Sequence, residues 1–419
     1  MKLEYFIANR LATSKHHKSS ISKPIIKIAI AAIAIGILMM IVAVATGIGL
    51  QQKIRQKVSA FNGHIIIKVF DDNQSEVSKV PISKDQEFYP KFKNVEGVKN
   101  IQVVATKAGI IRTENTFEGI VFKGISTDFN WENMKEYLIE GRKPKIDLAT
   151  QENGEIIISQ YLANRLLLKI GDKCNTFFMK EESGQSPNLR VFTIVGIFNS
   201  GFQEFDATYV IGDIRHIQRM NKWKADEVGA FEVFVHDFDK IQQVGNQVYN
   251  NTFNKKDPTK TVDTQIILDK YYYIFDWLKL FDFNIIVILT IMIIVATINM
   301  AVALLVLILE RTQMIGILKA LGANNWLIRK IFLYNAFYII IRGLFWGNVI
   351  AITLIIIQDR FGIITLNPEN YYVTVAPVYL NWGYILLLNL GTLLISLLVL
   401  IIPSYIISRV SPVKAIRFD

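Results

Sequence analysis

The organisation of this chain is set by the stretch Asn284–Ala323, NIIVILTIMIIVATINMAVALLVLILERTQMIGILKALGA. Its first part, Asn284–Leu309, is apolar almost without interruption and is long enough to cross about 30 Å of hydrocarbon as a helix. The charged remainder is too short to span. It has one apolar helical face, at the spacing i, i+3, i+4 and i+7: Met314, Ile317, Leu318 and Leu321. The stretch predicts a membrane span followed directly by a short amphipathic helix.

Three more apolar runs are long enough to span, at Pro24–Leu50, Ile331–Ile357 and Tyr384–Ile407. The 419 residues are 51% hydrophobic and carry a formal net charge of +10. The positive charge lies beside the apolar runs and no nucleic-acid-binding motif is present, so it indicates a membrane protein and no nucleic-acid partner. We predict an α-helical membrane protein with four transmembrane helices.

Lysine and arginine concentrate in the leader 1–23, the loop 310–330 and the tail 408–419, whereas the loop 358–383 holds only Arg360. Short segments rich in these residues stay in the cytoplasm. We therefore expect a multi-pass protein of the inner membrane, with both termini and the loop 310–330 in the cytoplasm.

The remaining segment, 51–283, lies outside in this topology and has the mixed pattern of a large α+β periplasmic domain, either one domain or two subdomains. Strands are predicted where β-branched and aromatic residues gather: 63–70, 100–112, 117–125, 189–198 and 229–238. Helical spacing is found at 130–141, ending at Gly141, and at 239–251. Residues 154–168 read as a strand then a helix, with Ser159 as the N-cap.

Two stalks, 51–61 and 269–284, continue the first and second spans outward. The second is rich in tyrosine and includes Trp277, which suits the lipid headgroup zone. The stalks either carry motion rigidly between the membrane and the outer domain or only anchor that domain.

The sequence holds no catalytic constellation. There is no Gly-rich loop ending in Lys-Ser/Thr for nucleotide phosphates, and the five histidines lack the HExxH spacing of a zinc site. The single cysteine, Cys174, excludes an internal disulfide. We expect a non-enzymatic chain that binds neither a metal nor a cofactor.

Within the spans, Gly343 and Gly347 form a GxxxG that lets two helix backbones approach closely. The first span has similar small pairs, Ala32 with Gly36 and Ala43 with Gly47. These seams either shift during function or are static packing.

Arg342 lies near the middle of the third span, where a charge normally faces the protein interior. Three polar residues are candidate partners: Thr297, Asn299 and Asn389. Pro403 is expected to kink or end the fourth span. Gly322 is placed as the C′ residue of the short amphipathic helix, which either lies flat on lipid or docks into a partner's groove.

ERTQMIGILKALGA resembles the cytoplasmic coupling segment of FtsX-like ABC-transporter permeases, and the four spans and the C-terminal SPVKAIRFD match their layout. Within that class the chain is similar to the lipoprotein-releasing LolC/LolE group. The blocks that carry this resemblance run in the same order: FIANRL, FNGHIII, GEIIISQYLANRLLLKIGDK and FTIVGIFNSGFQEFD.

The resemblance implies a permease dimer, of two copies or a copy and a paralogue, that binds two separate ATPase subunits. These partners use the ATP. It places eight residues in the ATPase groove: Glu310, Arg311, Met314, Ile315, Ile317, Leu318, Lys319 and Leu321. Lipid-modified lipoproteins would enter between the first two spans and pass to a periplasmic carrier. The family's carrier hook corresponds to Met179–Asn188, which departs from it in being short and polar.

Exposing two or three acyl chains to water would cost roughly 25–40 kcal/mol at about 0.8 kcal/mol per CH₂, so the path must shelter the chains. Six residues of the first two spans either line this path or simply pack or face lipid: Met39, Met40, Val44, Ile48, Ile288 and Met292.

Two other functions remain open. A related permease acts as a mechanical transducer, as in FtsX-like or MacB-like systems that drive efflux or control a cell-wall hydrolase. In a different class, the chain is a membrane-tethered receptor or structural protein, which leaves the coupling segment without a purpose. Binding of an ATPase separates the receptor from both permeases.

Overall fold

The computed structural model describes residues 22–70, 76–180, 186–252 and 262–409. They form two compact units. The helical unit comprises the described residues up to Gln51, Trp277–Thr365 and those from Val375 onward. The sheet unit comprises the described residues of Gln52–Asp276 together with Leu366–Thr374.

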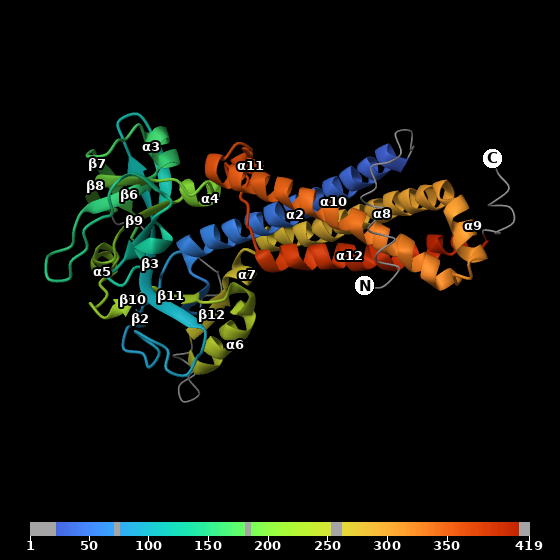
Figure 1. Ribbon diagram of the computed structural model, residues 1–419. Helices are drawn as coiled ribbons and strands as arrows, with labels where there is room; N and C mark the ends of the chain where they lie inside the picture. Colours follow the sequence, from blue (N-terminus) through green and yellow to red (C-terminus); the bar gives the residue numbers. More distant parts are fainter. Residues whose placement is uncertain (1–21, 71–75, 181–185, 253–261, 410–419) are drawn as a thin grey trace. The chain divides into compact units, whose positions relative to one another are not determined.

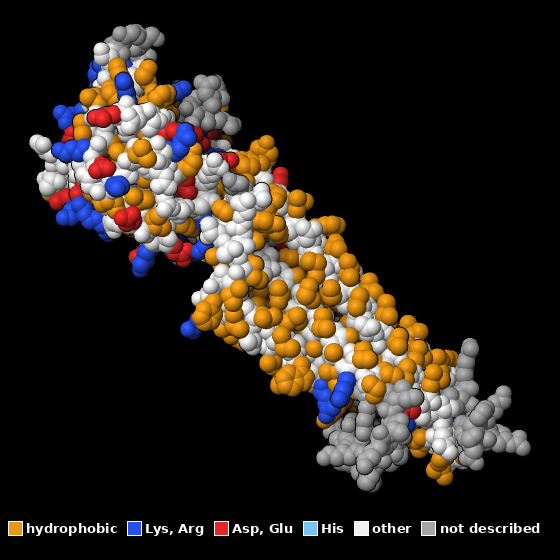
Figure 2. All heavy atoms as spheres, turned by 90° about the horizontal axis from the view of Figure 1, so that it is seen from above, with side chains coloured by type: hydrophobic (Ala, Val, Ile, Leu, Met, Phe, Trp, Pro, Cys, Tyr) orange, Lys and Arg blue, Asp and Glu red, His pale blue; other side chains and the backbone are white. Residues whose placement is uncertain are grey.

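Four long helices build the helical unit (Figure 1): α2 (Ser22–Asn62), α8 (Tyr272–Glu310), α10 (Asn325–Phe361) and α12 (Trp382–Ser404). In the described part of the chain these are the helices long and apolar enough to cross a membrane. Hydrophobic side chains make up most of the face of this unit that is visible in Figure 2, as expected of helices that face hydrocarbon. Two short helices, α9 (Thr312–Ala320) and α13 (Ile406–Arg409), accompany them.

The helix ends follow local sequence signals. Asn324 caps α10 by accepting a hydrogen bond from the Leu327 backbone N–H at 2.8 Å, and Gly362 ends α10 in the left-handed region with φ +56°. Pro403 lies in the last turn of α12, so its expected role at the end of that helix is confirmed. Both α2 and α8 are longer than the predicted spans. The last part of α2, to Asn62, includes the predicted stalk 51–61, and α8 begins at Tyr272, within the predicted stalk 269–284.

The sheet unit is built on a ten-stranded mixed sheet of order β12-β1-β11-β3-β4-β9-β6-β8-β5, in which β7 pairs with β3 and β8. Its strands are β1 (Ile65–Val69), β3 (Val98–Arg112), β4 (Phe117–Ile125), β5 (Leu138–Gly141), β6 (Glu155–Ser159), β7 (Lys173–Phe178), β8 (Asn188–Phe198), β9 (Tyr209–Asp213), β11 (Ala230–Val235) and β12 (Val262–Ile266). A small second sheet pairs β2 (Ile82–Ser83) with β10 (Glu227–Val228).

Four helices of the sheet unit connect its strands: α3 (Gln160–Leu166), α4 (Gln203–Asp206), α5 (Arg215–Asn221) and α6 (Ile241–Thr252). Two more belong to the same unit: α7 (Ile267–Lys270) follows β12, and α11 (Pro368–Tyr371) lies between α10 and α12. The mixture confirms the predicted fold class, four apolar helices with a large α+β domain between the first and second.

Most predicted elements of this unit are confirmed. Ser159 caps α3, accepting a hydrogen bond from the Leu162 backbone N–H at 3.0 Å. The predicted helix 130–141 is wrong: only Trp131–Asn133 form a 3₁₀ turn, and Leu138–Gly141 is the strand β5. Pairing with β8 at the sheet edge satisfies that backbone, and this tertiary contact overrides the local helical pattern.

Candidate functional site: the coupling helix and the root of the sheet unit

The short helix α9 follows α8 after a single intervening residue, Arg311. Its inner side is fixed, because Ile315 is fully buried and Met314 and Leu318 pack partly buried against the helical core. Its outer side is open, with Ile317 48% and Leu321 80% exposed. The four residues of the predicted apolar face therefore differ in burial: Met314 and Leu318 pack against the core, whereas Ile317 and Leu321 are exposed.

The open side of α9 continues a line of exposed residues from the end of α8, which we call the exposed stripe: Leu309, Gln313, Ile317 and Leu321. Gln313 and Ile317 are four apart on α9 and share one side of that helix, while Leu309 lies on α8 before the break at Arg311 and Leu321 is the C-cap residue of α9. Glu310 is also exposed and Arg311 is half-buried. The stripe thus combines three exposed apolar side chains with Gln313, and the core holds the opposite side of α9.

Lys319 holds the far end of α9. Its Nζ donates hydrogen bonds to the carbonyl oxygens of Ile407 at 2.7 Å and Ser408 at 3.3 Å, both in α13. Lys319 therefore points toward α13 and not along the exposed stripe. Gly322 follows with φ +88°, which confirms it as the C′ residue.

The glycine pair of α10 packs on α2. A Cβ at Gly347 would lie 1.9 Å from Ile37 Cγ2 and 2.6 Å from the Ala34 carbonyl oxygen, and one at Gly343 would lie 2.7 Å from Ile33 Cβ. Only glycine allows this approach. The small residues of α2 contact α8 instead, since a Cβ at Gly47 would meet Ile285 at 2.4 Å, and one at Gly36 would meet Ala296 at 3.8 Å.

Arg342 does not face the interior as expected. Its side chain is exposed, and its guanidinium lies over the Tyr338 ring at 4.7 Å. The expected partner Asn389 instead forms a reciprocal amide pair with Asn348, at 2.6 and 2.9 Å. Thr297 donates to the Ile293 carbonyl at 2.7 Å, and Asn299 is exposed. The glycine face of α10 takes the inner position, which turns Arg342 outward.

The six candidate path residues do not share one surface. Met40 is fully buried and Val44 is buried, so both belong to the helix packing in this conformation and cannot touch a lipid. Met39 is 44% exposed. The other three, Ile48, Ile288 and Met292, are half-buried.

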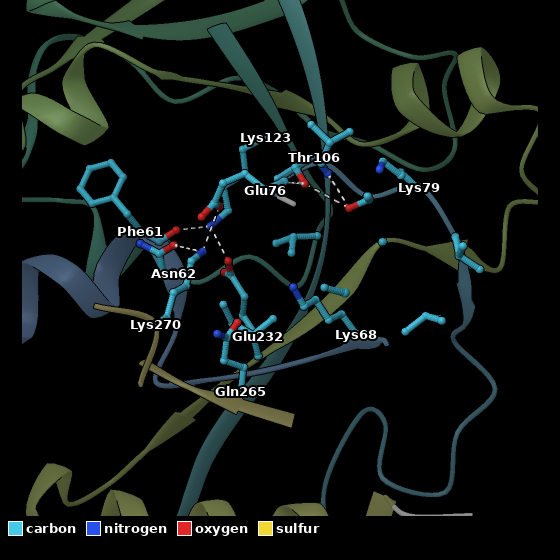
Figure 3. Close-up of a pocket in the computed structure, with 18 of the residues that line it drawn as sticks. Phe61, Asn62, Lys68, Glu76, Lys79, Thr106, Lys123, Glu232, Gln265 and Lys270 are labelled. Carbon is cyan, nitrogen blue, oxygen red and sulfur yellow. Dashed lines mark hydrogen bonds and ion pairs between the residues drawn. The ribbon is translucent and has the colours of Figure 1, made fainter. Parts of the chain in front are cut away.

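A buried ion pair marks the root of the sheet unit, where α2 ends (Figure 3). Lys123 on β4 pairs with Glu232 on β11, and their side chains are 3% and 5% exposed. Lys123 Nζ also donates to the Phe61 carbonyl in the last turn of α2, and Gln102 Nε2 donates to Glu232 Oε2 at 2.8 Å. Three strands and the last turn of α2 thus meet at the Lys123–Glu232 ion pair, whose two charged groups are both hydrogen-bonded.

The last residue of α2, Asn62, is held from the other stalk. Its side-chain oxygen accepts hydrogen bonds from Lys270 Nζ at 3.2 Å and from the Tyr271 hydroxyl at 2.9 Å. Lys270 also pairs with Glu76 at 2.9 Å. Asn62, Glu76 and Lys270 line a cavity of about 160 Å³ together with the Lys123–Glu232 pair. The one signal for this joint in the sequence is the lysine inside the apolar strand FEGIVFKGI, and the rest depends on residues far apart in the chain.

The segment Leu366–Thr374, between α10 and α12, belongs to the sheet unit. The Tyr372 ring stacks on Phe202 with centroids 4.4 Å apart, and the Tyr372 carbonyl accepts a hydrogen bond from Lys57 Nζ of α2 at 3.0 Å. Tyr372 is left-handed, with φ +57°, a costly conformation for a bulky residue. Nearby, burial raises the pKa of Asp206, whose carboxylate accepts hydrogen bonds from Ser200 and Gly201.

One face of the sheet carries an exposed apolar patch, which we call the exposed sheet face: Ile110, Phe117, Leu189 and Val191. These residues lie on β3, β4 and β8, joined through β7 by the pairings Ile110↔Phe177, Phe177↔Leu189 and Arg112↔Phe117. The patch adjoins the expected hook Met179–Asn188, of which 181–185 lie outside the described residues.

The described residues contain no group of three or more His, Cys, Asp or Glu placed to hold a metal ion. Cys174 is buried, and burial raises the pKa of its thiol to about 11.

Comparison with known proteins identifies two protein families that match this chain. Residues 28–250 match the MacB-like periplasmic core domain family, and residues 286–412 match the FtsX-like permease C-terminal family. The chain is 21% identical over 63% of its length to the lipoprotein-releasing system transmembrane protein LolC of Xylella fastidiosa (strain 9a5c), and it spans 65% of that relative.

Two further relatives align along nearly the whole chain. LolC of Neisseria meningitidis serogroup B is 22% identical over 100% of this chain and 99% of its own length. LolE of Haemophilus influenzae is 19% identical over 99% of both. With its four apolar helices and its domain between the first two, this multi-pass membrane protein belongs to the FtsX-like ABC permeases with a MacB-like periplasmic core domain.

Proposed function

We propose that this chain is the permease subunit of an ABC transporter that extracts lipid-modified lipoproteins from the inner membrane and hands them to a periplasmic carrier. The observation that carries the substrate class is the alignment with LolC and LolE proteins along nearly the whole length of both chains. Their names describe a lipoprotein-releasing system.

A separate ATPase drives the transport by docking on the exposed stripe of α9. A helix that docks into a groove on a partner needs exposed apolar side chains on one side. To transmit force, the same helix must also be held in place on its other side. The stripe offers Ile317 and Leu321, and the opposite side of α9 is held by buried Ile315 and by the hydrogen bonds of Lys319. The residues best placed to meet the ATPase are therefore Leu309, Glu310, Gln313, Ile317 and Leu321, while Met314, Ile315, Leu318 and Lys319 act as the support.

This docking places α9 and both termini in the cytoplasm and the sheet unit in the periplasm. The lysine- and arginine-rich segments 310–330 and 408–419 agree with that orientation. Two copies of the chain, or one copy and a paralogue, pair with two ATPase subunits.

Force reaches the sheet unit through α2. This helix is 41 residues long, and it packs on the glycines of α10 and ends on the Lys123–Glu232 pair. A continuous helix of that length, with its Phe61 carbonyl bonded to Lys123 of β4, transmits displacement without an intervening loop. The role of the stalk as a carrier of motion is thus favoured over a passive anchor.

The lipid path lies beside α2 and α8, with Met39 as the exposed residue of the six candidates and Ile48, Ile288 and Met292 half-buried. Met40 and Val44 would join it only after the helices separate. The carrier would meet the exposed sheet face, because apolar patches of this kind on a soluble domain mark interaction sites.

A mechanical transducer for efflux or for a cell-wall hydrolase is the second candidate, favoured by the match to the MacB-like core. An experiment with a lipoprotein substrate distinguishes this transducer from the lipoprotein-releasing permease. Reconstitute the chain with its ATPase in proteoliposomes that hold a triacylated lipoprotein, and the same lipoprotein with its acylated cysteine changed to serine as an unanchored control for leakage. ATP-dependent release of the acylated form to a carrier supports our proposal. ATP hydrolysis without release favours the transducer, and failure to bind any ATPase favours a receptor.

A further inference from the structure

Three segments carry the chain between the helical unit and the sheet unit: the end of α2, the start of α8, and the hairpin between α10 and α12. Within the sheet unit, side chains of all three meet on one short turn, residues 201–206 with the sequence GFQEFD, which we call the α4 turn. It contains α4 and joins β8 to β9.

The end of α2 is bound to the α4 turn through an aromatic stack. Phe61 lies against Phe205, with ring centroids 5.4 Å apart and planes inclined by 27°, and both side chains are 2% exposed. One turn earlier on α2, Lys57 approaches Gly201, where a Cβ would lie 2.8 Å from the lysine Nζ. Interiors packed this closely pass a displacement from one side chain to the next.

The start of α8 is bound to the same turn. The Tyr271 ring meets the Phe205 ring edge-on, with centroids 5.7 Å apart. The Tyr273 hydroxyl donates a hydrogen bond to Glu204 Oε2 at 2.6 Å. Phe205 therefore contacts aromatic rings from both stalks.

The hairpin between α10 and α12 is bound at both of its ends. At its tip, the Tyr372 ring stacks on Phe202, the residue that precedes α4. At its base, Gln358 of α10 donates hydrogen bonds from Nε2 to the carbonyls of Ile364 at 3.1 Å and Ala376 at 3.0 Å. Gln358 Oε1 also accepts one from the Ile364 backbone N–H at 2.9 Å. The hairpin thus connects the end of α10 to the α4 turn.

The α4 turn is itself anchored in the sheet. The Asp206 carbonyl accepts a hydrogen bond from the hydroxyl of Ser159, the last residue of β6. The Asp206 carboxylate accepts one from Ser200 Oγ at 2.7 Å, and all three residues are buried. A displacement of the turn therefore reaches β6 directly.

A passive anchor needs no third connection, because α2 alone continues unbroken from the helical unit into the sheet unit. We infer that the α4 turn combines the movements of α2, α8 and α10 and passes them to the sheet, with Tyr372 and Gln358 as positioning residues that bring α10 into this coupling. The inference rests on the proposed function, since it takes an ATP-driven movement of the helices as given. It adds a second route for force beside α2.

Reconstitution of the full chain with its ATPase in proteoliposomes tests the positioning roles by the lipoprotein released per ATP hydrolysed. Tyr372→Ala removes the contact at the tip of the hairpin, and Gln358→Leu removes the contacts at its base. Each variant should keep ATPase binding and hydrolysis but lower release per ATP about fivefold, as is typical of residues on a coupling network. Tyr372→Phe retains the ring and should release like the wild type, as should the control Ile363→Ala, an exposed residue of the same hairpin.

A second measurement follows the hairpin without relying on release. Spin labels on Lys93→Cys of the sheet unit and Arg360→Cys of α10, both exposed positions, report the distance between them by pulsed EPR in a Cys174→Ala chain bound to its ATPase. We expect an equally narrow distribution of distances with and without ATP, because the hairpin makes the two positions move together. Tyr372→Ala and Gln358→Leu should each broaden that distribution.

Wild-type release per ATP in both variants, or an equal loss in Ile363→Ala, overturns the positioning roles. Unchanged label distances in both variants overturn the coupling through the hairpin and leave a static anchor. Failure of the wild-type chain to release lipoprotein would contradict the proposed function instead, and the label distances would then decide the inference alone.

Discussion

The ring of Tyr372 stacks on the ring of Phe202, with centroids 4.4 Å apart and planes inclined by 11°. This contact holds the segment between α10 and α12 on the sheet unit, and Lys57 of α2 binds the carbonyl of the same tyrosine. A bulky residue is held in the left-handed region there, with φ +57°. We infer that the contact compensates for that conformation and keeps the segment in place.

Loss of this stack should loosen the segment. Tyr372→Ala removes an aromatic pair, which contributes about 1 kcal/mol beyond its buried area, and leaves the strained backbone without its partner. Limited proteolysis of the full chain should then cut within 366–374 faster than in the wild type. Tyr372→Phe keeps the ring and should resist like the wild type, and equal cutting of all three would contradict the assigned role.

The pair Lys123–Glu232 should be sensitive to single changes and tolerant of a double one. Lys123→Met leaves a buried carboxylate without its cation, which costs about 3–5 kcal/mol. Adding Glu232→Gln should recover most of that loss, because the charge left unpaired is gone. Cys174 is the chain's single cysteine and is buried in the sheet unit, so its labelling by a thiol reagent at increasing urea reports the opening of that unit. A double variant no better than the single one would contradict the ion-pair account.

His64 should make the sheet unit less stable in acid. Its Nδ1 accepts a hydrogen bond from the Val235 backbone N–H at 2.8 Å, and burial lowers its pKa from 6.5 to about 4. The unfolded chain therefore binds a proton between these values that the folded chain does not. Stability is full above about pH 6.5 and falls as the pH drops toward 4, by about 3 kcal/mol.

The Cys174 labelling assay, run in urea at pH values between 7 and 5.5 with rates corrected for thiolate content, measures this loss. His64→Asn keeps an acceptor for Val235 but cannot titrate, so its stability should vary less over this range. The variant would retain any contribution of His216, whose pKa burial also lowers. An unchanged slope in His64→Asn would rule out His64 as the source.

The contact between α2 and α10 should not accept a methyl group. Gly347→Ala places a Cβ against Ile37 and the backbone of Ala34, so the helices must separate at a cost of about 1–3 kcal/mol. Gly391→Ala on α12 is the matched control, since a Cβ there meets nothing within 4 Å. Thermal unfolding in detergent should show a lower midpoint for Gly347→Ala alone, and equal midpoints would mean that the seam yields freely.

Local signals in the sequence were enough to predict the elements that local chemistry fixes. Ser159 and Gly322 cap their helices as expected, because each acts through its own neighbouring backbone. The apolar runs gave the four long helices, because length and composition alone decide whether a helix suits hydrocarbon.

Features that depend on contacts between residues far apart in the sequence could not be predicted from local patterns. The strand at Leu138–Gly141 depends on pairing with β8, and the buried pair joins residues 109 positions apart. The helical periodicity of α9 identifies its apolar residues, but it does not predict which of them are buried. Ile315 is fully buried, whereas Ile317 is exposed. Arg342 is exposed because the side of α10 that packs on α2 is the side that carries Gly343 and Gly347.

The direct test of the coupling role is the ATP-dependent release of a triacylated lipoprotein by the chain reconstituted with its ATPase, measured for Ile317→Asp with Leu321→Asp. Both side chains are exposed, so the double variant should fold, and the matched control Leu148→Asp changes an exposed leucine of the sheet unit. We expect the double variant to lose ATPase binding and release together, while Leu148→Asp keeps both. Wild-type release without ATP, or full release by the double variant, would contradict the entry of force through α9.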